Sequence, residues 1–148
     1  MALKRSILFP LLALLLLALA WFETSLCQGP RFMRFQRQHM DPNPMGTPTY
    51  CNVMMVQRKM TQGHCKANNT FIHEPLQSVV RICGGQRVPC RNRSMNNCYQ
   101  SRYPMSTTLC ELTGPPRPPC RYITHPTVKQ LITVACDGNP LEPVHFGN

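Results

Sequence analysis

The sequence predicts an α+β fold for residues 28–148, a stretch whose length leaves room for one domain. Helical patterns come early in this stretch, and short segments rich in β-branched or aromatic residues come later. This order is typical of α+β proteins. Eight cysteines follow residue 27, and an even number of cysteines in a small chain indicates a disulfide framework.

Three short helices are expected. The first covers residues 30–40, because a proline opens the segment and an Asp-Pro pair ends it. Phe32, Phe35 and His39 are spaced by three and four positions, so one face of this helix carries both aromatic rings and the histidine. The other two helices are predicted at residues 50–59 and 75–83.

Five strands are expected in the rest of the chain, because short β-branched and aromatic runs are separated there by turn residues. A proline-rich loop is predicted at residues 114–119, where the backbone lacks the N–H groups of a ladder. A turn is predicted at residues 137–140, which read Asp-Gly-Asn-Pro. The expected strands are residues 69–73, 105–112, 121–124, 131–136 and 141–146.

The N-terminus has the pattern of a secretory signal peptide. Lys4 and Arg5 precede an apolar run at residues 7–22, and Ser-Leu-Cys follows as a small-residue cleavage site. A membrane anchor is the alternative, but the run contains a proline and is shorter than the roughly 20 residues of a spanning helix. We therefore expect a signal peptide at residues 1–27, and a secreted, extracellular domain at residues 28–148.

Removal of Cys27 leaves eight of the nine cysteines, which favours four disulfides in an oxidising compartment. Zinc binding is the competing interpretation. It is disfavoured because no two cysteines have the Cys-x2-Cys spacing of zinc knuckles. Spacing alone leaves the pairing open.

The charge of residues 28–148 points to anionic partners. This stretch has 14 Lys and Arg against 5 Asp and Glu, a formal charge of +9. Nucleic acid, anionic membranes and sulfated glycans all attract such a protein, and charge alone does not choose among them.

Candidate groups for phosphodiester cleavage stand at three places. His39 shares its helix face with aromatic rings, and His145 alternates with Val144 and Phe146 in a predicted strand. Two histidines supply a base and an acid near neutral pH. Lys66 adds a cation next to Cys65, whose disulfide would hold its backbone.

Three separated motifs resemble the pancreatic-type (ribonuclease A) superfamily: Cys-Lys-x-x-Asn-Thr-Phe at 65–71, Arg-Gln-His-Met-Asp at 37–41, and Val-Ala-Cys-x-Gly-Asn-Pro followed by Pro-Val-His-Phe at 134–140 and 143–146. All eight cysteines have counterparts, so the resemblance covers nearly all of the mature chain. Segments especially similar to the ribonuclease-four and angiogenin branches are residues 51–55, 58–61 and 71–74.

The resemblance implies three short helices packed on a bent antiparallel sheet, with two lobes around a cleft. It also implies a mechanism without metal or cofactor. His39 corresponds to the general base, His145 to the general acid, and Lys66 to the cation that stabilises the phosphorane. Gln38 and the Phe146 N–H correspond to groups that place the phosphate. The disulfides implied are Cys51–Cys110, Cys65–Cys120, Cys83–Cys136 and Cys90–Cys98.

The resemblance further implies subsites for RNA. Thr70 corresponds to the residue that binds a pyrimidine, with Asn69 and Phe146 beside it. Other correspondences are Asn97 and Asp137 at a second-base site, and Arg34, Arg37 and Arg91 at flanking phosphates.

Several positions depart from the family pattern. Leu109 replaces the acidic partner of the pocket threonine, Asn68 replaces a bulky aromatic residue, and Gly147 replaces the aspartate that supports the acid histidine. The loop between Cys90 and Cys98 is one residue longer than usual. Two glycosylation sequons begin at Asn68 and Asn92.

We therefore expect a secreted, monomeric endoribonuclease that cleaves single-stranded RNA 3′ of pyrimidines through a 2′,3′-cyclic phosphate. Two alternatives stay open: a cationic antimicrobial protein acting on anionic membranes or glycans, and an angiogenin-like signalling ligand with weak catalysis. The cytosolic ribonuclease inhibitor is a further expected partner.

Overall fold

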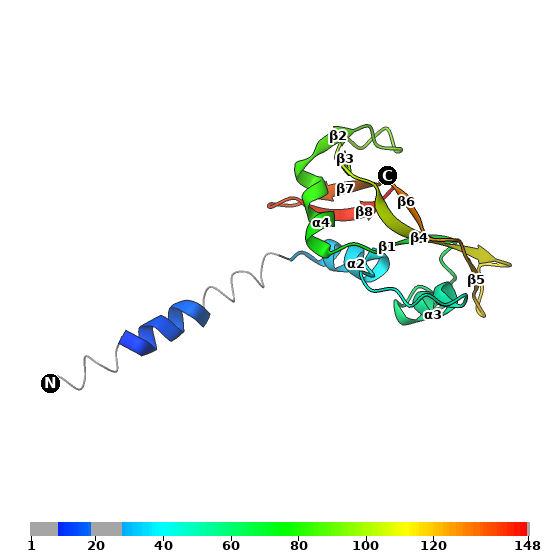
Figure 1. Ribbon diagram of the computed structural model, residues 1–148, viewed down its shortest axis with the longest axis horizontal. Helices are drawn as coiled ribbons and strands as arrows, with labels where there is room; N and C mark the ends of the chain where they lie inside the picture. Colours follow the sequence, from blue (N-terminus) through cyan, green and yellow to red (C-terminus); the bar gives the residue numbers. More distant parts are fainter. Residues whose placement is uncertain (1–8, 19–27, 148) are drawn as a thin grey trace. The chain divides into compact units, whose positions relative to one another are not determined.

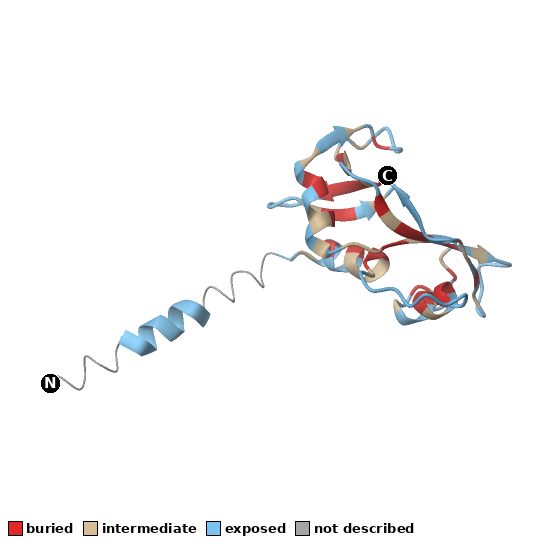
Figure 2. Ribbon diagram, in the orientation of Figure 1, coloured by how far each residue is buried: buried red, intermediate tan, exposed pale blue. Residues whose placement is uncertain are grey.

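The computed structural model describes residues 9–18 and 28–147 (Figure 1). The chain divides into two compact units, Met1–Pro30 and Arg31–Asn148. Residues 9–18 form a helix whose side chains are all exposed (Figure 2). Within the described ranges, no helix has the length and apolar character needed to cross a membrane. The expected cleavage site at residues 25–27 lies outside the described residues.

The three helices expected after residue 28 are present, with one difference. Helices α2 (Pro30–His39) and α3 (Tyr50–Gln57) begin where the sequence predicts. Helix α4 (Leu76–Val80) is shorter than predicted and continues as the 3-10 turn η1 (Arg81–Gly84). The β-branched residues Val79 and Val80 and the glycine pair that follows Cys83 have low helix propensity, which explains the early end of α4.

Two four-stranded antiparallel sheets form the rest of the fold. In the first sheet, β4 (Met105–Thr113) pairs with β1 (Asn68–Ile72), β5 (Arg121–Thr124) and β6 (Val128–Gln130). In the second, the order is β2 (Gln86–Val88), β3 (Cys98–Gln100), β7 (Thr133–Asp137) and β8 (Glu142–Phe146). The sequence did not predict β2, β3 and β6, because a strand of three residues is too short to show an alternating pattern.

Strand β1 lies between the two largest apolar clusters. Phe71 and Ile72 are adjacent and fully buried, so their side chains leave opposite faces of the strand. Phe71 packs with Tyr50 and Met55 of α3, whereas Ile72 packs with Phe35 of α2. Figure 2 shows buried residues in α2, α3 and the strands that pack against them. The same strand therefore fixes both helices relative to its own backbone.

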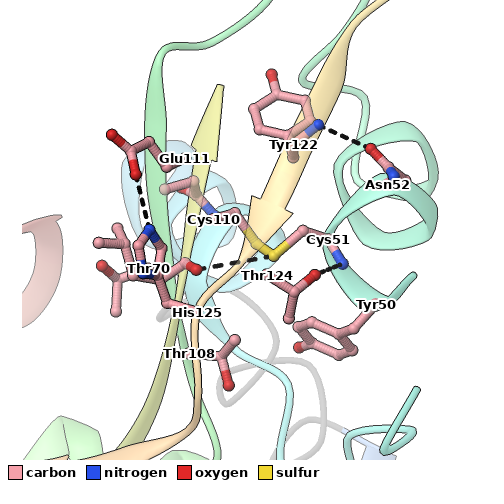
Figure 3. Close-up of a disulfide and its surroundings, with 12 residues drawn as sticks. Tyr50, Cys51, Asn52, Thr70, Thr108, Cys110, Glu111, Tyr122, Thr124 and His125 are labelled. Carbon is pink, nitrogen blue, oxygen red and sulfur yellow. Dashed lines mark hydrogen bonds and ion pairs between the residues drawn. A yellow bond between two sulfur atoms is a disulfide. The ribbon is translucent and has the colours of Figure 1, made fainter. Parts of the chain in front are cut away.

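Four disulfides join the elements, and each could contribute roughly 2–4 kcal/mol by restricting the unfolded chain. Figure 3 shows one of them attaching α3 to the first sheet. Beside it, the Cys51 N–H donates to Thr124 Oγ1 at 3.0 Å, and the Tyr122 N–H donates to Asn52 Oδ1 at 2.8 Å. The four pairs, which are those that the family resemblance implies, are Cys51–Cys110, Cys65–Cys120, Cys83–Cys136 and Cys90–Cys98.

Candidate active site

A cavity of about 390 Å³ opens where the end of α2, the start of β1 and the end of β8 meet. The structure thus brings together residues from three distant parts of the sequence. The side chains expected to do chemistry line this one cavity. Its lining residues are Gln38, His39, Lys66, Asn68, Asn69, Thr70, Arg91, His145, Phe146 and Gly147.

His39 is the last residue of α2 and is buried. Its ring lies between Phe35, at a centroid distance of 5.1 Å, and Phe146, on which it stacks at 5.4 Å. Burial among these rings lowers the pKa of His39 from 6.5 to about 4. The hydrogen bond to Thr70 opposes this shift, and the charges of Lys66 and His145 add to it.

The hydrogen bond of His39 defines its tautomer. Nδ1 lies 2.8 Å from the Thr70 carbonyl oxygen, which can only accept, so Nδ1 carries a proton. With a pKa of about 4, the ring is neutral at pH 7, and Nε2 is then a hydrogen-bond acceptor. The side chain is therefore prepared to take up a proton.

Lys66 is held beside this histidine by the buried side chain of Asn69. The Lys66 Nζ donates to Asn69 Oδ1 at 2.8 Å, and Asn69 Nδ2 donates to the Gln38 carbonyl at 2.7 Å. Burial lowers the pKa of Lys66, and the Arg37 guanidinium lowers it further. The Cys65–Cys120 disulfide anchors the adjacent backbone. Asn69 thus joins the lysine to α2, and it also lines the cavity with Thr70 and Phe146, where the family resemblance places a base.

His145 is exposed on β8, directly opposite Ala135 of β7. In the described chain, no side chain is hydrogen-bonded to its ring. Gly147 lines the cavity at φ +73°, a backbone conformation that favours glycine, and its N–H donates to Thr133 O at 2.7 Å. The glycine offers no carboxylate to orient His145, as the sequence indicated.

Comparison with known proteins places this arrangement in a family. Residues 30–147 match the family described as Pancreatic ribonuclease. The chain belongs to this family. It is 49% identical to "Ribonuclease pancreatic" of Lemur catta over 150 residues, covering 99% of this chain and 95% of the relative. It is 45% identical to "Ribonuclease pancreatic delta-type" of Rattus exulans over 149 residues, covering 99% and 97%. Neither relative is named as a ribonuclease-four or an angiogenin, so the special similarity to these two branches stays a prediction.

In this pancreatic ribonuclease family member, the threonine that the family resemblance assigns to base binding stands opposite an apolar residue. Thr70 on β1 pairs in register with Leu109 on β4, which is 39% exposed and has no polar side-chain atom. The Thr70 hydroxyl makes no hydrogen bond within the described residues. It is therefore available to a ligand.

Four residues that the family resemblance assigns to RNA binding do not line the cavity. Arg34 is exposed on α2, and Arg37 donates a hydrogen bond to the Arg58 carbonyl. Asn97 Nδ2 donates to the Cys136 carbonyl at 3.0 Å. Asp137 is paired with Arg31, whose hydrogen bond holds the pKa of Asp137 below its usual range. The expected flanking cation that does line the cavity is Arg91.

Arg58 is a supporting residue that the sequence did not reveal. Its Nη1 donates to the carbonyl oxygens of Arg37 and Met40 at 2.8 Å, and to that of Gln36 at 3.3 Å. These carbonyls lie at and just after the C-terminal end of α2, where the last carbonyls of a helix have no later turn to bond them. The Gln36 carbonyl also accepts from the Met40 N–H at 3.0 Å. Arg58 thus holds the helix end that carries Gln38 and His39. A single arginine after a helix gives no sign of this role.

Proposed function

We propose that this chain is a secreted endoribonuclease that cleaves RNA on the 3′ side of pyrimidines, using His39, Lys66 and His145. The observation that carries this proposal is the state of His39. It is buried and neutral, its Nδ1 is committed to Thr70, and it shares one cavity with Lys66 and His145. Family membership supports the same activity.

The chemistry follows from these groups. His39 Nε2 takes the proton of a ribose 2′-hydroxyl, whose oxygen attacks the adjacent phosphorus. Lys66 stabilises the charge that develops on the phosphorane oxygens. His145 gives a proton to the departing 5′-oxygen, which leaves a 2′,3′-cyclic phosphate. Water then opens this ring, with the two histidines in exchanged roles.

The proposed base preference rests on the edge of β1. The Thr70 backbone and hydroxyl bind a pyrimidine, and Phe146 lines the same cavity. Leu109 cannot hydrogen-bond Thr70, so the discrimination between uracil and cytosine is weak. Arg91 contacts a flanking phosphate, and Arg34 and Arg37 add longer-range attraction. Asn97 and Asp137 form a second-base site when the ion pair between Asp137 and Arg31 opens and Asp137 binds RNA instead.

Single-histidine variants test the mechanism. Each proton-transfer role is worth roughly 10²–10⁴-fold in rate, so we expect His39→Ala and His145→Ala each to lose at least two orders of magnitude on poly(C) and poly(U), with poly(A) a poor substrate throughout. The pH–rate profile should be bell-shaped. His64→Ala is the matched control, because His64 is exposed and does not line the cavity. Near-normal cleavage by either active-site variant would remove this mechanism.

The proposed location and partners have their own tests. After expression in animal cells, the medium should contain a chain that begins at Gln28, runs as a monomer in gel filtration, and binds the cytosolic ribonuclease inhibitor. The two sequons are proposed to differ in occupancy. Asn92 is exposed in the loop between Cys90 and Cys98, whereas a glycan on Asn68 would crowd the active-site cavity.

A second candidate role, damage to anionic microbial membranes or binding of glycans, is favoured by the charge of +9 in residues 28–148. An angiogenin-like signalling role is compatible with the same charge. Neither role requires the lysine in the cavity, and this difference separates them from catalysis.

A further inference from the structure

A second cavity, of about 360 Å³, shares no lining residue with the candidate active site. It lies between the α4–η1 segment on one side and β3 and the loop at residues 101–104 on the other. Its volume is within the range of small-molecule sites. The polar lining residues are Ser78, Arg81, Gln100, Arg102 and Tyr103.

Two guanidinium groups at this cavity are available to a ligand. Arg81 and Arg102 are exposed, and within the described residues neither guanidinium has an ion pair or hydrogen bond. By contrast, Arg31 is bound to Asp137, and Arg87 donates to the Asn96 carbonyl. No Asp or Glu lines the cavity to neutralise its charge. Guanidinium forks bind phosphate oxygens in bidentate geometry, so the cavity is suited to an anion of this kind.

The remainder of the lining suits a flat, partly apolar body attached to the anion. Ile82 and Met105 are buried apolar lining residues. Tyr103 is 74% exposed, so much of its ring is open to contact. Aromatic side chains stack on nucleobases with little dependence on sequence. Ser78 and Gln100 add hydrogen-bonding groups. A sulfated sugar would also satisfy the arginines, but the flat base of a nucleotide offers the Tyr103 ring a larger stacking surface.

We propose that this cavity binds a nucleotide, with its phosphate on Arg81 and Arg102 and its base against Tyr103. The nucleotide is either free or part of an RNA strand. This site is separate from the proposed catalytic machinery, and its test is a binding measurement that stands whether or not RNA is cleaved.

The test follows backbone amide NMR signals of the protein during titration with adenosine 5′-monophosphate. We expect the amide signals of a first group, Gly84, Gly85 and Tyr103, to shift together and to give one dissociation constant. The signals of a second group, Thr70 and Phe146, are fitted separately and report binding at the candidate active site. The double variant Arg81→Ala/Arg102→Ala should weaken binding at the first group at least tenfold, and leave the second group unchanged. Arg121→Ala is the matched control, because Arg121 is an exposed arginine on β5 that lines neither cavity. Both constants should be unchanged in this control.

A second variant separates the base from the phosphate. Tyr103→Ala should weaken adenosine 5′-monophosphate about tenfold, the size of one base–aromatic stack, without affecting inorganic phosphate. A DNA oligonucleotide then distinguishes a free nucleotide from a nucleic-acid strand as the natural ligand. It lacks the 2′-hydroxyl, so the proposed mechanism cannot cleave it during the measurement. If the oligonucleotide binds more tightly than adenosine 5′-monophosphate, the natural ligand is a strand. Equal affinities indicate a free nucleotide. The proposal fails if Gly84 and Gly85 do not respond, if the double arginine variant binds as tightly as the wild type, or if a sulfated disaccharide binds there more tightly than the nucleotide.

Discussion

Asn69 shows how much of this site depends on a single amide. Asn68 and Asn69 are identical and adjacent, but Asn68 is exposed and Asn69 is buried. Alternation along β1 separates them, so only Asn69 reaches both Lys66 and the Gln38 carbonyl. The residue therefore positions the lysine and the end of α2 at once.

The variant Asn69→Ala should affect stability and catalysis together. A buried carbonyl loses its donor, which costs about 1–3 kcal/mol of unfolding free energy. The lysine also loses its fixed position, and we expect kcat to fall on the order of 10²-fold, with a small change in KM. Urea denaturation and steady-state cleavage of a dinucleotide measure the two effects. Asn68→Ala is the matched control, and an equal loss in that variant would show that Asn69 has no special role.

His39 makes the stability of the protein depend on pH. Its folded-state pKa is about 4 against 6.5 in the unfolded chain, so between these values the unfolded chain binds a proton that the folded chain excludes. The stabilisation is complete above pH 6.5 and is lost as the pH falls towards 4, by on the order of 3 kcal/mol. The unfolding free energy of the wild type should therefore fall more steeply with acid than that of His39→Gln. His64→Gln should follow the wild type. If the unfolding free energies of the wild type and His39→Gln fall in parallel with pH, the lowered pKa of His39 is contradicted.

At the scale of elements, the end of α2 depends on a residue from the far end of α3. Arg58 directly follows α3 and bonds three carbonyls at the C-terminal end of α2. Its guanidinium also lies over the Phe71 ring, 6.0 Å from the centroid. The two helices thus share one anchor next to Gln38 and His39.

The variant Arg58→Lys keeps the charge and tests the geometry. The lysine nitrogen lies one bond closer to the backbone than Nη1, the atom that makes all three hydrogen bonds, and the planar cation over the Phe71 ring is also lost. We therefore expect a loss of roughly 1–3 kcal/mol and a lower kcat through the displaced end of α2. Thermal denaturation and RNA cleavage provide the measurements. Arg121→Lys on β5 makes the same exchange at an exposed site and should be neutral. A stability equal to that of the wild type would mean that the three hydrogen bonds contribute little.

The sequence predicted those elements whose pattern is long enough to be visible. The aromatic and histidine stripe identified α2. A run rich in β-branched residues and bounded by turn residues identified residues 105–112, most of β4. The short strands β2 and β3 escaped because three residues are too few to show an alternating pattern. They pair across the loop that the Cys90–Cys98 disulfide closes. The role of Arg58 and the different surroundings of Asn68 and Asn69 also escaped, because they depend on contacts between distant segments.

At the scale of the whole molecule, charge and catalysis can be separated. Lys66→Ala changes the charge of residues 28–148 only from +9 to +8, so long-range attraction to an anionic membrane should barely change. The same variant removes the cation that we propose stabilises the phosphorane, and we expect a loss of at least about 10²-fold in RNA cleavage. Bacterial killing by the two proteins should be equal if killing is a membrane effect. A parallel loss of killing and cleavage would instead make any toxicity ribonucleolytic.

The division of the active site between two sheets has a consequence for the cell that makes the protein. Thr70 belongs to β1 in one sheet, and Lys66 directly precedes that strand. His145 belongs to β8 in the other sheet, and the sheets share no strand. Cys51–Cys110 and Cys65–Cys120 secure the first sheet, and Cys83–Cys136 secures the second. A nascent chain in the reducing cytosol lacks both sets of bonds. We therefore expect the reduced chain to be less stable by roughly 2–4 kcal/mol for each absent bond. The cavity would then form only after oxidation, and the transcripts of a producing cell would be spared until that step.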